Sequence, residues 1–188
     1  MAATRDKGLI FRPNSSSFDC YVDADFAGNW DPDGKPEQDS DTARSRTGFV
    51  VLYANCPIIW ASKLQTIIAL SSTESEYVAL STALREIIPI MNIAKEMESL
   101  GFDVPGTQPK VHCRVFEDNA GALHMATNDK FRPRTKHINV RYHHFRSHVD
   151  NGDITIHAIS TENQPADYLT KSLPAITFQQ HRYMIQGW

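Results

Sequence analysis

Four acidic residues, each at or near the end of an apolar stretch, are the side chains best suited to chemistry. They are Asp23, Glu76, Asp118 and Asp167, in the segments YVDADFAG, SSTESEYVAL, FEDNAGAL and NQPADYLT. Carboxylates gathered in one place repel one another, and a divalent cation is the usual compensation. Because hard oxygen ligands suit Mg²⁺ or Mn²⁺, we expect a metal site made only of carboxylates, at strand ends and helix starts.

Each of these acids also has an ordinary structural explanation. Glu76 could close a capping box in which Thr73 is the N-cap. Asp118 could cap the helix that follows it, and Asp167 lies in a first helical turn, where the macrodipole favours an acid. Asp23 lies in a predicted strand, where a carboxylate is disfavoured unless it is solvated at an edge or has a function. Taken singly the acids leave these alternatives open, and their joint occurrence favours the metal site.

Period-two alternation predicts the strands that must position these acids. The second and third strands are separated only by a short polar turn at Asn55, which is typical of a hairpin. Pro57 should stand at the start of the third strand. The expected strands cover residues 18–26, 48–54, 57–62, 111–117 and 154–159.

Apolar residues at steps of three and four predict one long helix from about Thr73 to Gly101, which Pro89 should kink or split. A short helix should follow Asp118 and run through Ala126. Weaker helical patterns cover 136–149, closed by Asn151 and Gly152, then 166–173, opened by Pro165, and finally part of 175–188. This order of elements implies an α/β fold, a mixed five-stranded sheet flanked by helices.

Length and composition indicate a single core. The chain has 188 residues, of which 41% are hydrophobic, enough for one domain with appendages. We expect an N-terminal tail or connection remnant over 1–17, the domain over 18–174, and a C-terminal helical tail over 175–188. No stretch resembles a secretory or membrane-spanning segment, so a soluble, unexported protein without a membrane partner is expected.

Several other site types are disfavoured. Three well-separated cysteines without a CxxC pair indicate neither a disulfide framework nor a zinc knuckle, and they fit a reducing compartment. The acidic loop over 28–42 lacks the ligand ladder of an EF-hand, because Gly34 directly follows Asp33. The net charge of −3 does not by itself indicate a nucleic-acid-binding protein.

Positive charge is nevertheless concentrated between residues 130 and 149, a stretch with six cations and no acid. Such a basic stripe can bind phosphates, with an affinity that falls as salt rises, and a solvated helix face is the alternative. A zinc site is disfavoured because no nearby acid or cysteine completes its histidines. The cations of the stripe include Arg134, Lys136 and Arg141, and the histidines of this disfavoured zinc site would be His137, His143 and His144.

Six segments of the chain closely resemble one known family. They are DADFAG, SRTGFVV, ALSSTESEYVAL, EDNAGAL, RTKHINVRYHHFR and ENQPADYLTK. Over residues 18–173 the sequence resembles the ribonuclease H domain of copia-type (Pseudoviridae) LTR retrotransposon Pol polyproteins. The resemblance implies a ribonuclease H-like fold and cleavage of the RNA strand of RNA/DNA hybrids. It also implies a reverse transcriptase domain upstream in the same polyprotein, and a cytoplasmic location within virus-like particles.

The catalytic acids of that family fall on Asp23, Glu76, Asp118 and Asp167. By resemblance they bind two Mg²⁺ ions, which Mn²⁺ can replace, and the two-metal reaction leaves 3′-hydroxyl and 5′-phosphate ends. Glu74 is the one competitor for the role of Glu76. By resemblance Glu76, one residue before Tyr77 and three before Ala79, matches the position of the family's helix acid, and Glu74 should point a half-turn away.

Other features of the resemblance concern substrate contacts. Ser71, Ser72 and Asn119 could contact 2′-hydroxyls in the minor groove. The histidine that relatives carry before the last aspartate is missing from the short loop 160–163, and His157 lies instead within a predicted strand.

Two other functions fit the sequence less well. A non-catalytic module of a reverse transcriptase, which only binds the hybrid, is disfavoured by four intact acids. An integrase or transposase would place its glutamate last in the sequence, whereas Glu76 comes second.

Overall fold

A mixed five-stranded sheet forms the centre of the protein. The computed structural model describes residues 6–14, 17–30, 43–104, 111–128 and 144–188. Neighbouring strands follow the order β3-β2-β1-β4-β5, in which β1, β2 and β3 pair antiparallel while β1, β4 and β5 pair parallel. The strands are β1 (Phe18–Asp25), β2 (Arg46–Tyr53), β3 (Cys56–Leu64), β4 (Cys113–Glu117) and β5 (Ile154–Ala158). The predicted mixed five-stranded sheet is confirmed.

The β2–β3 hairpin turns through two residues with positive φ, Ala54 at 52° and Asn55 at 65°. Positive φ at both central residues is typical of the tight turns that match strand twist. The strand register shifts between Val51 and Leu52, where Pro57 stands opposite. A proline without an N–H is tolerated there because β3 is an edge strand. The predicted hairpin is confirmed, with strands slightly longer than expected.

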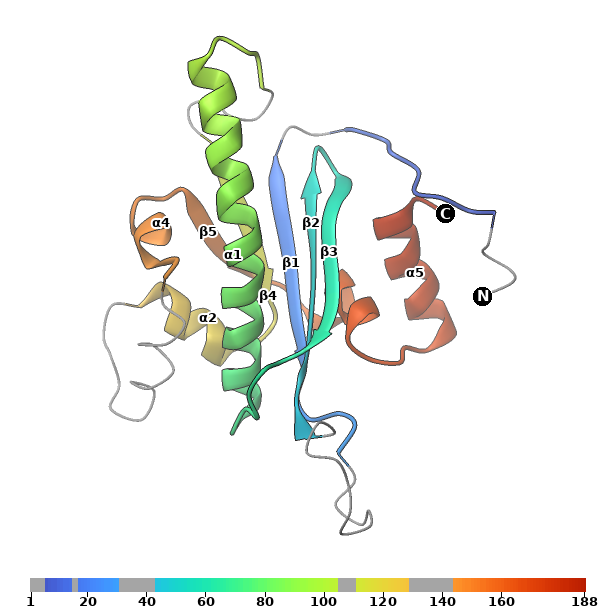
Figure 1. Cartoon of the computed structure of the whole chain (residues 1–188). Coiled ribbons are helices and arrows are strands. Elements are labelled where there is room, and N and C mark those ends of the chain that lie inside the picture. Colours follow the sequence, from blue (N-terminus) through green and yellow to red (C-terminus); the bar gives the residue numbers. More distant parts are fainter. Residues whose placement is uncertain (1–5, 15–16, 31–42, 105–110, 129–143) are drawn as a thin grey trace.

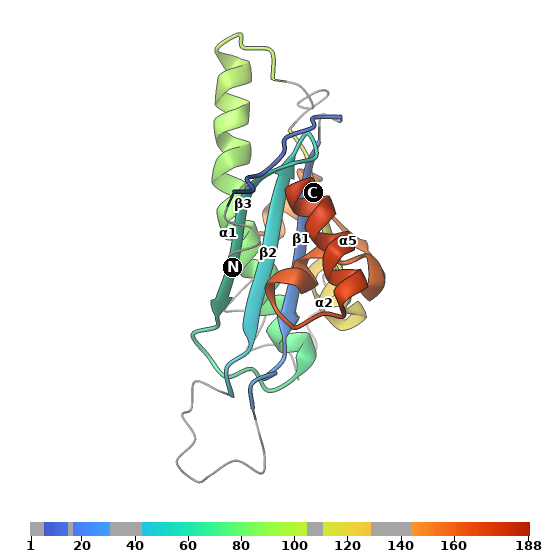
Figure 2. The same ribbon diagram turned by 90° about the vertical axis from the view of Figure 1, so that its right-hand side faces the viewer.

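Helix α1 (Ser72–Ser99) packs along one face of the sheet, and helix α5 (Ala175–Gln186) lies on the other (Figures 1 and 2). Of the kink or split expected at Pro89, the split is wrong, since α1 continues through this residue. Pro89 is exposed, so its ring faces solvent, where water can satisfy the carbonyl that the missing N–H leaves unpaired. The uninterrupted helix keeps one apolar stripe on the sheet.

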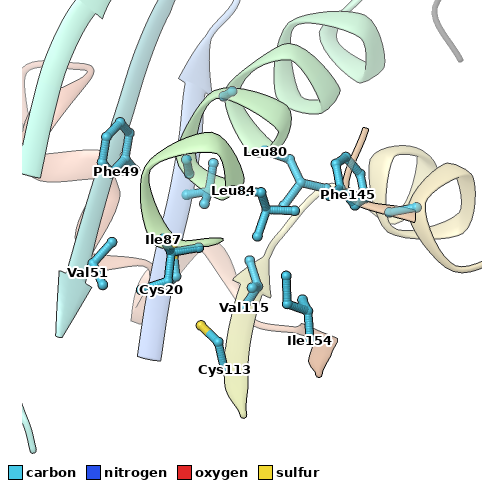
Figure 3. Packing of buried hydrophobic residues seen from close by; sticks show 14 of the residues in the cluster. Cys20, Phe49, Val51, Leu80, Leu84, Ile87, Cys113, Val115, Phe145 and Ile154 are labelled. Carbon is cyan, nitrogen blue, oxygen red and sulfur yellow. The ribbon is translucent and has the colours of Figure 1, made fainter. Parts of the chain in front are cut away.

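The main core lies between α1 and the sheet. Leu80, Leu84 and Ile87 of α1 point toward the strands, where they meet Cys20 and Val115 (Figure 3). All five side chains are fully buried. Cys20 and Cys113 act here as small apolar groups, and burial raises their thiol pKa values well above the ordinary range, which makes them unreactive. This packing holds α1 against the sheet and thereby positions its first turn.

The remaining elements are short. Helix α2 (Ala120–Thr127) follows β4, and helix α4 (Arg146–Asp150) precedes β5. Of the helix predicted over 136–149, residues 136–143 lie outside the described part, and the rest is helical only from Arg146. Gly152, with φ of 68°, ends this segment as predicted.

The helix predicted over 166–173 is instead the short 3₁₀ helix η5 (Pro165–Leu169), which follows a 3₁₀ turn, η4 (Thr161–Asn163). This helix ends at Leu169, and the hydroxyl of its C-cap residue Thr170 donates a hydrogen bond to the Asp23 carboxylate. The segment is therefore bound to β1 instead of extending away from the sheet.

The described N-terminal segment passes beside the C-terminal end of α5 (Figure 1). Ile10 N donates to Gln186 O at 3.0 Å, and the Trp188 indole donates to Gly8 O at 2.8 Å. Lys7 Nζ and the Arg182 guanidinium each lie 4.3 Å from the Trp188 ring centre, a cation–π arrangement. The helical prediction within 175–188 is confirmed by α5. Among the described helices, none combines the length and the apolarity needed to span a bilayer.

Candidate metal centre

Three carboxylates from separate elements converge at one end of the sheet. Asp23 comes from β1, Glu76 from the second turn of α1, and Asp118 from the residue that follows β4. One oxygen of each lies within 4.8 Å of the others. Asp23 and Glu76 are buried and Asp118 is half-buried. Three oxygen atoms so placed form an arrangement suited to a hard divalent cation.

Asp23 faces the side of the sheet covered by η5. Its hydroxyl partner is Thr170 Oγ1, and Lys171 Nζ lies 3.8 Å from Asp23 Oδ1. Across the β1–β2 ladder Asp23 pairs with Gly48. A Cβ at Gly48 would lie 2.5 Å from Thr170 Cγ2 and 3.1 Å from Ala166 O. The absent side chain therefore lets η5 approach β2 and reach Asp23.

The start of α1 leaves Glu76 free for the site. The capping box suggested by Thr73 and Glu76 is wrong, because the N-cap is Ser71, whose side chain accepts from Glu74 N at 3.1 Å. Glu74 Oε2 accepts in turn from Leu70 N at 2.8 Å. Glu74, the rival acid, is thus engaged at the helix start.

A buried glutamine supports the same turn of α1. Gln65 Nε2 donates to Thr47 Oγ1 at 3.1 Å and to Ser75 O at 2.8 Å. Ser75 directly precedes Glu76, so this amide links β2 to the backbone that carries the acid. The second turn of α1 is thereby held at a defined distance from the sheet.

Asp118 does not cap α2 either. The N-cap is Asn119, whose Oδ1 accepts from Ala122 N at 3.0 Å. Asp118 Oδ2 accepts instead from Thr161 Oγ1 at 2.7 Å, so the loop before η5 contacts the carboxylate through a hydroxyl. A Cβ at Gly121 would lie 2.5 Å from Thr73 Oγ1, which shows how closely α2 approaches the start of α1.

Asp167 lies beside this three-acid group and interacts with Asp23 and with a cation. Lys171 Nζ is 2.9 Å from Asp167 Oδ1, one turn further along the chain. Burial, followed by the charge of Asp23, raises the pKa of Asp167 to about 7 even though Lys171 opposes the shift. Lys171 therefore offsets part of the repulsion between the two aspartates.

The acids are electrostatically costly without a cation. Burial, then the charges of Glu117, Asp23 and Asp118, raise the pKa of Glu76 to about 11. Its Oε2 atom is buried and has no hydrogen-bond partner. A divalent cation would favour the ionised form and supply the missing partner. The residues present therefore fit a metal centre.

Glu117, beside the predicted acids, is a further buried acid that sequence reasoning missed. It is only 1% exposed, its Oε1 accepts from Asn119 N at 3.1 Å, and its Oε2 lacks a partner. Burial, opposed by this hydrogen bond and reinforced by Asp118 and Asp23, holds the pKa of Glu117 well above its usual range. Glu117 shares the buried face of Val115 in β4, and that alternation could have revealed it.

The residues predicted to bind nucleic acid fall in two groups. Ser71 and Ser72 are exposed at the start of α1, and Asn119 is half-buried beside it, where Thr73 Oγ1 lies 3.4 Å from Asn119 Oδ1. Arg134, Lys136 and Arg141 lie outside the described residues, as do His137 and His143 of the disfavoured zinc site.

The described end of the basic stripe, together with His157, is engaged elsewhere. Arg146 Nε lies 3.4 Å from the Asp150 carboxylate within α4. His144 Nδ1 lies 3.4 Å from Ser81 Oγ, and burial lowers the pKa of His144. His157 Nε2 contacts Thr155 Oγ1 at 2.8 Å on β5, and its ring lies beside that of Phe116.

The sheet order and the position of the acids define the fold of ribonuclease H. LC11-RNase H1, isolated from compost, superimposes with a TM-score of 0.51 and 16% identity, covering 82% of this chain and 93% of that one. The structure of LC11-RNase H1 in complex with an RNA/DNA hybrid gives a TM-score of 0.50 at 16% identity, over 82% and 94% of the two chains. At this level of identity the similarity establishes the fold.

Relatives of this chain include retrovirus-related Pol polyproteins. It is 36% identical over 159 residues to the retrovirus-related Pol polyprotein from transposon TNT 1-94 of Nicotiana tabacum, covering 85% of this chain and 10% of that protein. It is 34% identical over 180 residues to the one from transposon RE2 of Arabidopsis thaliana, covering 95% and 11%. The chain thus spans about a tenth of the length of these relatives. No family model matches the sequence.

Proposed function

We propose that the chain is a metal-dependent endonuclease that hydrolyses the RNA strand of RNA/DNA hybrids. The observation that carries the proposal is the convergence of Asp23, Glu76 and Asp118 within 4.8 Å on a ribonuclease H fold. The hybrid bound to LC11-RNase H1 supports the substrate class. The Pol polyprotein homologues support a polyprotein context. Within it we propose a role in reverse transcription, beside a reverse transcriptase domain of a copia-type retrotransposon and within cytoplasmic virus-like particles.

Asp23, Glu76, Asp118 and Asp167 would hold two Mg²⁺ ions, or Mn²⁺ in their place. When bound, the ions would lower the pKa of the attacking water and neutralise the negative charge that develops on the leaving oxygen. Asp23 and Asp118 occupy the centre, with Glu76 on the leaving-group side and Asp167 on the water side. The Thr170 hydroxyl orients Asp23 by donating to its carboxylate.

Hydrolysis proceeds by in-line displacement at phosphorus. The water oxygen forms the new bond to phosphorus, and the bond from phosphorus to the 3′-oxygen breaks. The water loses a proton to solvent and the departing 3′-oxygen gains one, so the products carry a 3′-hydroxyl and a 5′-phosphate. Asp167 would hold the ion that activates the attacking water.

The choice of the RNA strand needs contacts with its 2′-hydroxyls. Ser71, Ser72 and Asn119 border the acids at the start of α1 and α2, and we assign these contacts to them. The cations Arg134, Lys136 and Arg141 would hold backbone phosphates, so affinity for the hybrid should fall as salt rises.

A direct test is cleavage of a labelled RNA/DNA hybrid, compared with duplex RNA and duplex DNA, with and without Mg²⁺. We expect hybrid cleavage only with Mg²⁺, and a loss of more than about 100-fold in Asp118→Asn, which removes a ligand charge. Asp6→Asn, which changes an exposed aspartate in the N-terminal segment, is the matched control and should cleave normally. Absence of cleavage by the unmodified chain, or full activity in Asp118→Asn, would contradict the proposal.

A further inference from the structure

A fully buried glutamine lies where β1 and β4 separate. Gln164 Nε2 donates to Val22 O at 2.8 Å and to Phe116 O at 3.2 Å, while its Oε1 accepts from Ala166 N at 3.4 Å. Its side chain is completely inaccessible to solvent. One amide group therefore connects three segments, β1, β4 and η5.

The position of this amide follows from the sheet. The parallel β1–β4 ladder ends at the pair Tyr21 and Phe116, and the strands are no longer paired beyond it. Buried backbone carbonyls in such a gap are costly unless they find a donor. A primary amide suits the gap because its nitrogen carries two hydrogens, one for each carbonyl, and its oxygen can still accept.

Each contact lies close to an acid of the metal centre. The β1 carbonyl belongs to the residue immediately before Asp23, and the β4 carbonyl lies two residues before Asp118. Gln164 itself is three residues before Asp167, whose N–H donates to Gln164 O at 3.2 Å. We infer that Gln164 is a positioning residue that sets the spacing between these three carboxylates, and this inference rests on the proposed function for its use in binding metal.

Alternative side chains could not do the same. Methionine has a similar length and no donor, an ionised glutamate would turn only acceptors toward two carbonyls, and asparagine is one methylene shorter. Loss of the amide would let β1, β4 and η5 relax independently. The consequence should be greatest for an ion with strict geometry: Mg²⁺ demands near-ideal octahedral coordination, whereas Ca²⁺ accepts flexible arrangements.

The experiment measures Mg²⁺ and Ca²⁺ binding to the full chain by calorimetry, together with hybrid cleavage. In Gln164→Met we expect Mg²⁺ affinity to fall about 10- to 100-fold, the range found for outer-shell changes, and Ca²⁺ affinity to change less than about threefold. The kcat should fall with Mg²⁺ affinity, and KM for the hybrid should stay constant. Leu84→Ala, a cavity in the main core, is the control that loses stability and keeps Mg²⁺ affinity.

Unchanged Mg²⁺ affinity in Gln164→Met would overturn the inference, and so would an equal loss for both ions, which would indicate general damage to the site. If Gln164→Met does not fold, Gln164→Asn retains a buried amide and should show the same preferential loss of Mg²⁺. An unmodified chain that binds no Mg²⁺ and cleaves no hybrid would refute the proposed function itself. The two failures are therefore distinguishable.

Discussion

Replacement of Glu76 by glutamine should stabilise the metal-free protein at neutral pH. The pKa of Glu76 in the folded chain is about 11, compared with an ordinary value of 4.5. The folded state therefore binds this proton more tightly than the unfolded state. The free energy of unfolding consequently falls as pH rises from about 4.5 toward the folded-state pKa. Glutamine is neutral at every pH and removes this dependence.

The size of the effect follows from the pH interval. One pKa unit corresponds to about 1.36 kcal/mol, so the three units from 4.5 to about pH 7.5 give at most about 4 kcal/mol. For a chain of this length, each kcal/mol moves the melting temperature by about 2–4 °C. Glu76→Gln should thus raise the Tm by up to about 8–16 °C at about pH 7.5, and the difference should vanish near pH 4.5.

Thermal unfolding in a chelator, followed by circular dichroism between these two pH values, measures the difference. Added Mg²⁺ should stabilise the unmodified chain, by about 2.7 kcal/mol at 100 times its Kd, and Glu76→Gln much less. Glu74→Gln is the matched control, because its amide oxygen can still accept from Leu70 N while it leaves the metal site unchanged. A Glu76→Gln variant that is no more stable at neutral pH, or whose advantage does not depend on pH, would refute the reasoning.

Three further predictions concern the surroundings of the acids. Gly48→Ala should cost about 1–3 kcal/mol and weaken Mg²⁺ binding, as calorimetry can test, since the new methyl would displace Thr170 from Asp23. Mg²⁺ affinity should increase with pH through about 7 with release of protons, seen as a buffer-dependent binding enthalpy, because a proton on Asp167 competes with the ion; a pH-independent affinity would contradict this. Leu84→Ala should lower the urea unfolding free energy by about 2–5 kcal/mol, and a smaller loss would mean that the core refills the cavity.

Sequence patterns predicted the sheet well because its signals are local. Period-two alternation and the turn at Asn55 depend on neighbours in the chain, and each strand appears close to its expected bounds. The helix through Pro89 shows the limit of such rules: a proline breaks a helix only if the surroundings cannot accommodate it, and this one is exposed. The low helix propensity of proline predicted an interruption, whereas the packing of α1, which leaves Pro89 exposed, allows the helix to continue.

The site was only partly predictable for a related reason. The sequence predicted that Asp23, Glu76 and Asp118 gather in one place, and one carboxylate oxygen of each lies within 4.8 Å of the others. The cap at Ser71 was missed because two overlapping S/T-x-x-E patterns begin two residues apart, and only the fold selects between them. Contacts such as that of Thr161 with Asp118 join residues 43 positions apart and leave no periodic signal.

The buried acids of the candidate metal centre are costly to the stability of the fold. Glu76 and Glu117 each keep a buried carboxyl oxygen without a partner, and burial raises the pKa of both. Natural folds retain such costs mainly where function requires them. Lys171 offsets part of the repulsion between Asp23 and Asp167. Gln65 and Gln164 hold the backbone beside Glu76 and Asp23 without adding charge. Positioning by amides keeps the acids close together, whereas further cations in place of Gln65 and Gln164 would neutralise more of the negative charge that a divalent ion needs.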